Sequence, residues 1–140
     1  LKDQVARLSL EDYVIFAGSV EHSDVGNYYR MADLFVSASD TETQGLTYIE
    51  ALAAGTKCVV YSTDYTEHVF DNRELGSTFT TKSEMTNEII DYLKANQFII
   101  PKDLKEKKLI DVSAATFARK IEAFYQEAIQ NKQKTEVNYD

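Results

Sequence analysis

Residues 34–61 read LFVSASDTETQGLTYIEALAAGTKCVVY and contain two short apolar runs on either side of a helical pattern. Leu34–Ser37 and Cys58–Tyr61 are predicted strands, and residues 45–54 are a predicted helix that ends at Gly55. Short, wholly apolar strands that alternate with helices are typical of parallel βαβ units. The segment therefore predicts an α/β fold with a Rossmann-like open parallel sheet and helices on both faces.

Further elements are predicted on both sides of this unit. Upstream we expect a helical segment through Val5, Leu8 and Leu10, a strand at Tyr13–Ala17, and a helix with Ser23 as N-cap that continues to Met31. Downstream we expect a helix at Glu67–Phe70, a strand at Ser77–Thr80, helical structure from Ser83 interrupted at Pro101, and a long helix from Ser113. The chain is thus expected to end in C-terminal helices, with residues 131–140 as a frayed tail.

Composition narrows the possible functions. The 140 residues suffice for one domain, and the net charge of −8 argues against a duplex nucleic acid partner. A membrane surface is not excluded, because Lys102, Lys105, Lys107 and Lys108 form a local basic cluster, although such clusters are more often solvated faces. No apolar run approaches the roughly 20 residues of a membrane span.

The single cysteine, Cys58, excludes an internal disulfide and a cysteine-based zinc site, and it fits a reducing compartment. His22 and His68 have no partner at metal-ligand spacing. We therefore expect no metal and no cofactor.

A polar stretch that could form a binding site follows the strand at Leu34–Ser37. Ligands of open α/β sheets bind at the carboxyl ends of strands, and the helix that starts after Gly45 offers free N–H groups to a phosphate. Glu42 and Glu50 could accept hydrogen bonds from sugar hydroxyls. The arrangement is typical of a nucleotide-sugar site. On spacing alone, both acids could equally be solvated surface groups.

The same residues resemble the E-x7-E signature of GT4-family retaining glycosyltransferases, which have the GT-B fold. Glu42 and Glu50 match the two acids, and residues 50–55, EALAAG, match the end of the motif. The resemblance to the family extends from Tyr13 to Phe70. Residues 41–47 and 117–125 are in addition similar to bacterial diacylglycerol glucosyltransferases. Two departures are Lys57, where the family usually has proline, and Thr63–Tyr65, which replaces a Gly-Gly loop.

The resemblance implies a role for each matched residue. Glu42 would be the catalytic-site acid that contacts the donor hexose, and Glu50 would bind the ribose hydroxyls. The backbone amides of Gln44, Gly45, Leu46 and Thr47, with the Thr47 hydroxyl, would hold the hexose and diphosphate. The backbone near Val20 would lie along the uracil. The donor substrate would be a UDP-sugar, with glucose expected.

The resemblance also implies that residues 1–130 are a truncated nucleotide-sugar-binding domain, the C-terminal half of a GT-B enzyme. The missing part would carry the basic groups for the diphosphate and would bind the acceptor, a lipid or a sugar. We therefore expect the fragment alone to be inactive and to bind the donor weakly at best. The parent is expected to be cytoplasmic, peripheral on the inner face of the plasma membrane. Alternatives are a GT-B epimerase or phosphorylase, or a non-catalytic nucleotide-binding or interaction module, although the chain has no G-x-G-x-x-G turn.

Overall fold

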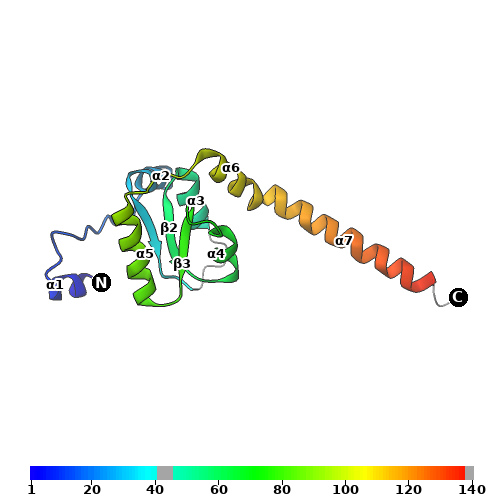
Figure 1. Cartoon of the computed structure of the whole chain (residues 1–140), viewed down its shortest axis with the longest axis horizontal. Coiled ribbons are helices and arrows are strands. Elements are labelled where there is room, and N and C mark those ends of the chain that lie inside the picture. Colours follow the sequence, from blue (N-terminus) through cyan, green and yellow to red (C-terminus); the bar gives the residue numbers. More distant parts are fainter. Residues whose placement is uncertain (41–45, 138–140) are drawn as a thin grey trace.

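The computed structural model describes residues 1–40 and 46–137. Along the chain the elements are α1 (Lys2–Arg7), α2 (His22–Met31), β1 (Leu34–Ser37), α3 (Leu46–Ala54), β2 (Lys57–Tyr61), α4 (Asp64–Val69), β3 (Gly76–Phe79), α5 (Lys82–Ala95), α6 (Lys102–Asp111) and α7 (Ala114–Val137) (Figure 1). The alternation of strands and helices from β1 to α5 confirms the predicted α/β class.

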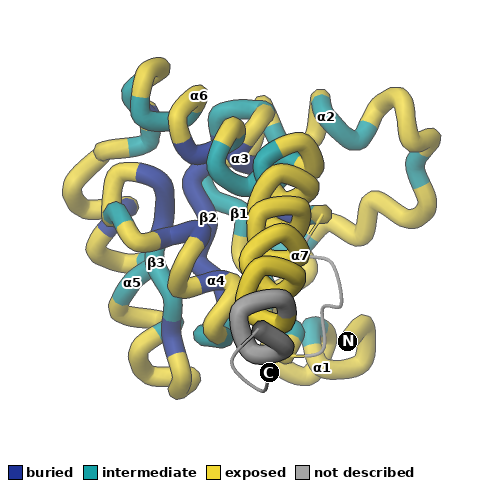
Figure 2. Tube along the Cα trace, turned by 90° about the vertical axis from the view of Figure 1, so that its right-hand side faces the viewer, coloured by how far each residue is buried: buried dark blue, intermediate teal, exposed yellow. Residues whose placement is uncertain are grey.

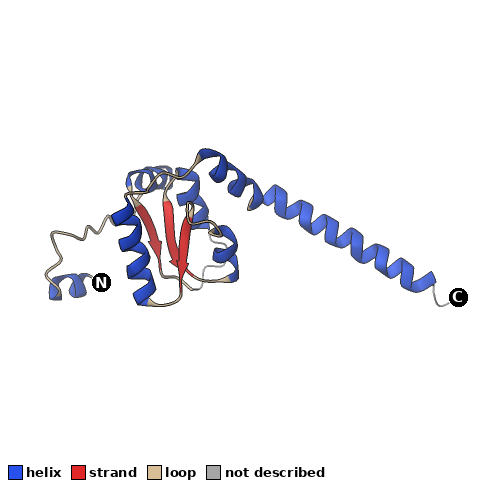
Figure 3. Cartoon of the chain, viewed as in Figure 1, coloured by secondary structure: helices blue, strands red, loops and turns tan. Residues whose placement is uncertain are grey.

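The strands form a parallel sheet in the order β1-β2-β3 (Figure 3). Phe35 is opposite Cys58 in the first pair, and Val60 is opposite Thr78 in the second. Because the strands are parallel, their carboxyl ends lie along one edge of the sheet. This edge is where the predicted polar stretch leaves β1.

Helices cover both faces of the sheet, as the sequence predicts. Cys58 and Val60 of β2 face one core cluster, where they pack with Leu52 of α3. The alternate residue Val59 packs in a second cluster with Phe79 of β3 and Tyr92 of α5. Figure 2 shows the buried residues gathered in and around β2. Each such apolar side chain stabilises the fold by about 1.5–3 kcal/mol when fully buried.

The end of α3 is set by Gly55, which has a φ of +94°. The Gly55 N–H donates to the Leu52 carbonyl at 3.0 Å, and the Thr56 N–H donates to the Ala51 carbonyl at 2.9 Å. This pair of bonds is a Schellman motif, which requires the left-handed conformation that glycine adopts without strain. It confirms the predicted helix end and directs the chain into β2.

Two upstream predictions were wrong. Tyr13–Ala17 is not a strand, and Ile15 in its centre is 91% exposed. An apolar run of this kind is stable as a strand only when a neighbouring strand pairs with it, and this segment pairs with none of the strands in the described residues. Ser23 is not an N-cap, because α2 already begins at His22 and its N-cap is Glu21.

The last helix, α7, runs from Ala114 to Val137 and so enters the stretch 131–140 that we expect to be a frayed tail. Glutamine, lysine and glutamate in this part of the sequence are good helix formers. The frayed tail stays a prediction. α7 projects away from the sheet, and Phe124, Tyr125 and Ile129 on it are exposed (Figure 1).

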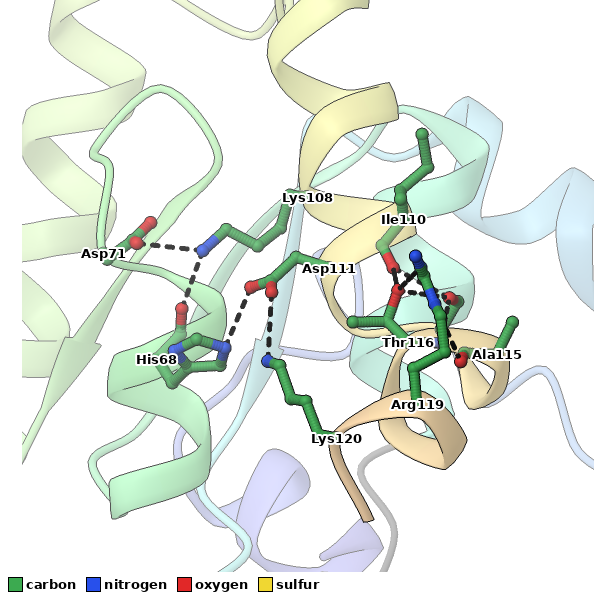
Figure 4. A network of polar contacts seen from close by, with 10 residues as sticks. His68, Asp71, Lys108, Ile110, Asp111, Ala115, Thr116, Arg119 and Lys120 are labelled. Carbon is green, nitrogen blue, oxygen red and sulfur yellow. Dashed lines mark hydrogen bonds and ion pairs between the residues drawn. The ribbon is translucent and has the colours of Figure 1, made fainter. Parts of the chain in front are cut away.

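A network of polar contacts joins α4, α6 and the start of α7 (Figure 4). Asp111 at the end of α6 accepts contacts from His68 Nε2 at 2.9 Å and from Lys120 Nζ at 3.3 Å. The hydrogen bond from Lys120 holds the pKa of the Asp111 carboxyl below its usual range. Thr116 Oγ1 donates to the Ile110 carbonyl at 2.7 Å, which fixes the turn from α6 into α7.

The predicted basic cluster does not form one solvated face. Lys108 is buried and contacts Asp71, Lys105 Nζ donates to the Ala53 carbonyl at 3.3 Å, and Lys102 pairs with Glu106 at 3.8 Å. The ammonium groups are therefore directed to different partners. These contacts give no support to a membrane contact at this surface, the less favoured interpretation of the cluster.

Candidate functional site

The candidate site lies at the edge of the sheet where β1 ends. Ser37 closes β1, and α3 begins on the other side of the loop at Leu46. Of the predicted residues, Glu42, Gln44 and Gly45 lie outside the described residues, and their roles stay predictions. Leu46 is exposed and Thr47 is half-buried in the first turn of α3. Both therefore lie where the amide groups of a helix start are not yet paired within the helix.

Glu50 lies one turn further along α3 and is half-buried. Its Oε2 accepts a hydrogen bond from the Tyr29 hydroxyl of α2 at 3.3 Å. Glu50 thus has a fixed protein contact across the two helices. The interpretation of Glu50 as a freely solvated helix residue does not fit this contact.

Glu50 also lines an open hollow of about 410 Å³ between α2 and α3. We call this the α2–α3 hollow; its lining residues are His22, Ser23, Val25, Gly26, Tyr29, Arg30, Glu50, Ala53 and Ala54. Val20 is half-buried and lies just before α2, whose first residues line the hollow. Val20 therefore lies next to α2, which forms one wall of the hollow. This position is compatible with the prediction that the backbone near Val20 lies along the uracil.

Several polar residues of the α2–α3 hollow, Tyr29 and Arg30 among them, were not predicted from the sequence. Tyr29 is half-buried whereas its neighbour Tyr28 is exposed, so the structure turns only one of the two phenols towards Glu50. Arg30 lies in the hollow's wall, and its guanidinium donates to Asn27 Oδ1 at 2.5 Å. Two tyrosines at adjacent positions of a helix cannot both face one site, and the local sequence does not show which of them does so.

The two departures from the family pattern have clear structural roles. Thr63 is the N-cap of α4 in a capping box: its Oγ1 accepts from the Thr66 N–H at 3.1 Å, and Thr66 Oγ1 accepts from the Thr63 N–H at 2.8 Å. Lys57 begins β2 and is only 3% exposed, with its Nζ 5.5 Å from the centre of the Tyr92 ring. Burial lowers the pKa of the Lys57 ammonium. It begins β2 at the amino ends of the strands, opposite the candidate site.

Other candidate reactive groups are engaged elsewhere. Cys58 is buried, and burial raises the pKa of its thiol to about 12, so it is an inert core thiol. His68 pairs with Asp111 in the α4–α6 network. Within residues 1–40 and 46–137 no group of three or more His, Cys, Asp or Glu side chains could hold a metal ion. A search of the same residues found no helix with the length and apolar character to cross a membrane.

Comparison with known proteins identifies relatives of this chain. The profile of the family described as "Glycosyl transferases group 1" matches residues 1–111. An alpha-monoglucosyldiacylglycerol synthase of Streptococcus pneumoniae is 36% identical over 92% of this chain, and one of Acholeplasma laidlawii is 32% identical over 87%. A mannosylfructose-phosphate synthase of Agrobacterium fabrum is 42% identical over 56%. The matches span only 29%, 31% and 20% of these three relatives, and no solved structure matches the chain.

Proposed function

The chain belongs to the glycosyl transferases group 1 family, and on this premise we propose that it forms the donor-binding part of a retaining glucosyltransferase. The donor in this proposal is UDP-glucose, and the acceptor is a diacylglycerol-type membrane lipid. Membership and fold rest on the family match and the parallel sheet. The donor, the acceptor and the stereochemical outcome are parts of the proposal.

The observation that carries the proposal is the position of Glu50 in the α2–α3 hollow. A carboxylate has two oxygens and can accept several hydrogen bonds, and Tyr29 occupies one site on Oε2. The remaining acceptor sites suit the adjacent hydroxyls of a ribose. Glu50 lies one turn after the start of α3, so a diphosphate linked to that ribose would extend from the hollow towards the helix start.

In the proposed reaction, the amides at the start of α3, Glu50 and Glu42 each contact a different part of the donor. Free amides at the start of α3, including those of Leu46 and Thr47, would stabilise the negative charge that develops on the leaving diphosphate. Glu50 would hold the ribose and so fix the position of the diphosphate. Glu42 would contact the hexose during transfer. The retained configuration is implied by the family resemblance.

The names of two relatives favour the lipid acceptor. Both the Streptococcus pneumoniae and the Acholeplasma laidlawii proteins are named alpha-monoglucosyldiacylglycerol synthase, and the stretch that they share with this chain covers most of it. A diacylglycerol stays in the bilayer, so an enzyme that glucosylates it must work at the membrane surface. We therefore propose that the parent enzyme is peripheral on the inner face of the plasma membrane.

Calorimetric titration of the 140-residue chain with UDP, UDP-glucose and NAD tests the donor assignment. We expect UDP and UDP-glucose to bind and NAD not to bind. Glu50→Gln should weaken both uridine ligands by about tenfold, as for a lost hydrogen bond to a charged group, whereas His68→Gln should leave them unchanged. Binding of NAD in preference to UDP, or equal effects of the two variants, would contradict the proposal.

A further inference from the structure

The contact between Tyr29 and Glu50 joins two helices that form opposite walls of the α2–α3 hollow. The phenol oxygen of Tyr29 donates to Glu50 Oε2 at 3.3 Å, and both residues line the hollow. A glutamate side chain has several rotatable bonds, and a hydrogen bond at one oxygen restricts them. The contact therefore limits where the second carboxylate oxygen can lie.

Tyr29 is itself held from two directions. Its ring packs edge-on against Phe35 of β1, with centroids 5.5 Å apart and an interplanar angle of 75°. Its carbonyl accepts a hydrogen bond of 2.5 Å from Thr56 Oγ1, and Thr56 is 3% exposed. The ring and the backbone of Tyr29 are thus fixed to the sheet and to the turn after α3. Only a residue anchored in this way can hold another side chain in place.

Glu50 is anchored equally well at its backbone. The next residues of α3, Ala51 and Leu52, are fully buried in the core, and the Schellman motif at Gly55 closes the helix. The side-chain torsions of Glu50 are therefore the main freedom left at this point of the site. The hydrogen bond from Tyr29 restricts these torsions.

We propose that Tyr29 is a positioning residue that holds the Glu50 carboxylate ready for the paired hydroxyls of a ribose, and so makes the site selective for ribonucleotides. The inference rests on the proposed function, because it assumes that Glu50 meets the ribose. A carboxylate already ordered loses less side-chain entropy when the ligand binds. The phenol does not need to touch the ligand for this effect.

The test compares ligands that differ only in the ribose hydroxyls. The affinities of UDP and of 2′,3′-dideoxy-UDP are measured for the unmodified chain, Tyr29→Phe and Glu50→Gln, with Tyr28→Phe as matched control on the same helix. The unmodified chain should prefer UDP by about tenfold or more, since two hydroxyls bind a charged acceptor. Tyr29→Phe should lose most of this preference and leave dideoxy-UDP binding unchanged, whereas Tyr28→Phe should retain it.

The outcomes separate the two proposals. A Tyr29→Phe chain that keeps the full preference, or that loses affinity for both ligands equally, would overturn the positioning role and leave the proposed function intact. An unmodified chain that binds neither ligand, or does not distinguish them, would overturn both. If Tyr29→Phe does not fold, Glu50→Asp keeps the charge but shortens the reach to Tyr29, and it should lose the same preference; a retained preference would overturn the positioning role.

Discussion

Lys108 Nζ lies 2.9 Å from Asp71 Oδ2 and fastens α6 to the end of α4. The same ammonium donates to the His68 carbonyl at 2.8 Å, and Lys108 is only 8% exposed. Asp71, by contrast, remains more than half exposed. The lysine therefore depends on these two partners far more than the aspartate depends on the lysine.

Removing the carboxylate partner of Lys108 should destabilise the chain more than replacing Lys108 itself by an apolar residue. Asp71→Asn leaves a mostly buried ammonium without its carboxylate and should lower the free energy of unfolding by about 1–3 kcal/mol. Lys108→Met removes the buried charge and leaves Asp71 in contact with water, so it should cost less. Urea unfolding measures both, with Asp103→Asn at an exposed position of α6 as control. Equal losses for Asp71→Asn and Asp103→Asn would contradict the role of the buried ammonium.

The Asp111 carboxyl should titrate at a pH that depends on Lys120. The hydrogen bond from Lys120 is the main cause of the lowered pKa, with smaller contributions from His68 and Lys108. The contact stabilises the fold at pH values above the usual pKa of an aspartate carboxyl. This contribution is lost as the pH falls through the lowered pKa of Asp111. Lys120→Met should move the Asp111 pKa upwards in a carbon-detected NMR titration. An unchanged value, or an equal change in Lys94→Met on α5, would count against this contact.

Cys58 predicts a loss of stability in alkali. The thiol has an ordinary pKa of 9.0 and a pKa of about 12 in the fold, so between these values the unfolded chain loses a proton that the folded chain keeps. Stability should therefore fall as the pH rises from 9, by up to about 1.4 kcal/mol per pH unit from this group. Urea unfolding at pH 8 and pH 10 measures the decline. Cys58→Ala should start less stable and decline less steeply; parallel declines would exclude the thiol as the cause.

Two glycines should respond to alanine in opposite ways. A Cβ on Gly76 would clash with the Cys58 carbonyl oxygen and come within 2.8 Å of Phe70 Cδ1, so Gly76→Ala should cost about 1–3 kcal/mol or more. A Cβ on Gly26 in α2 would meet nothing nearer than Arg30 Nη1 at 3.5 Å, and alanine favours a helix by about 1 kcal/mol over glycine. Thermal unfolding should therefore show a lower midpoint for Gly76→Ala and a higher one for Gly26→Ala. A shift in the same direction for both would refute this steric argument.

The central strand β2 of the βαβ unit was predictable because it is buried on both faces. Val59 and Val60 point to opposite cores, so most positions of such a strand are apolar, with the buried Lys57 at its start as an exception. Tyr13–Ala17 is similarly apolar but pairs with no strand among the described residues, and a local pattern carries no information on whether a neighbour exists. Strand propensity is thus necessary for a strand but does not create one.

The candidate site was predictable only at the residues that belong to a motif. Glu50 was assigned from its match to the E-x7-E signature, and the structure gives it a position in the α2–α3 hollow. Tyr29 was missed because its contact with Glu50 depends on the rotation of α2 against α3, and its neighbour Tyr28 has the same chemistry. Such a contact follows from the packing of two helices and has no counterpart in either segment alone.

The projecting helix α7 is mechanically a lever arm. Its residues Ala114–Val137 rise by about 1.5 Å each, which gives a rod of about 36 Å. The rod is joined to the body at the turn where Thr116 bonds to the Ile110 carbonyl and Lys120 to Asp111. A tilt of about 10° at this turn moves the far end by about 6 Å over that length. A small change of angle at this turn would therefore be amplified into a displacement of several ångströms at the tip of the arm.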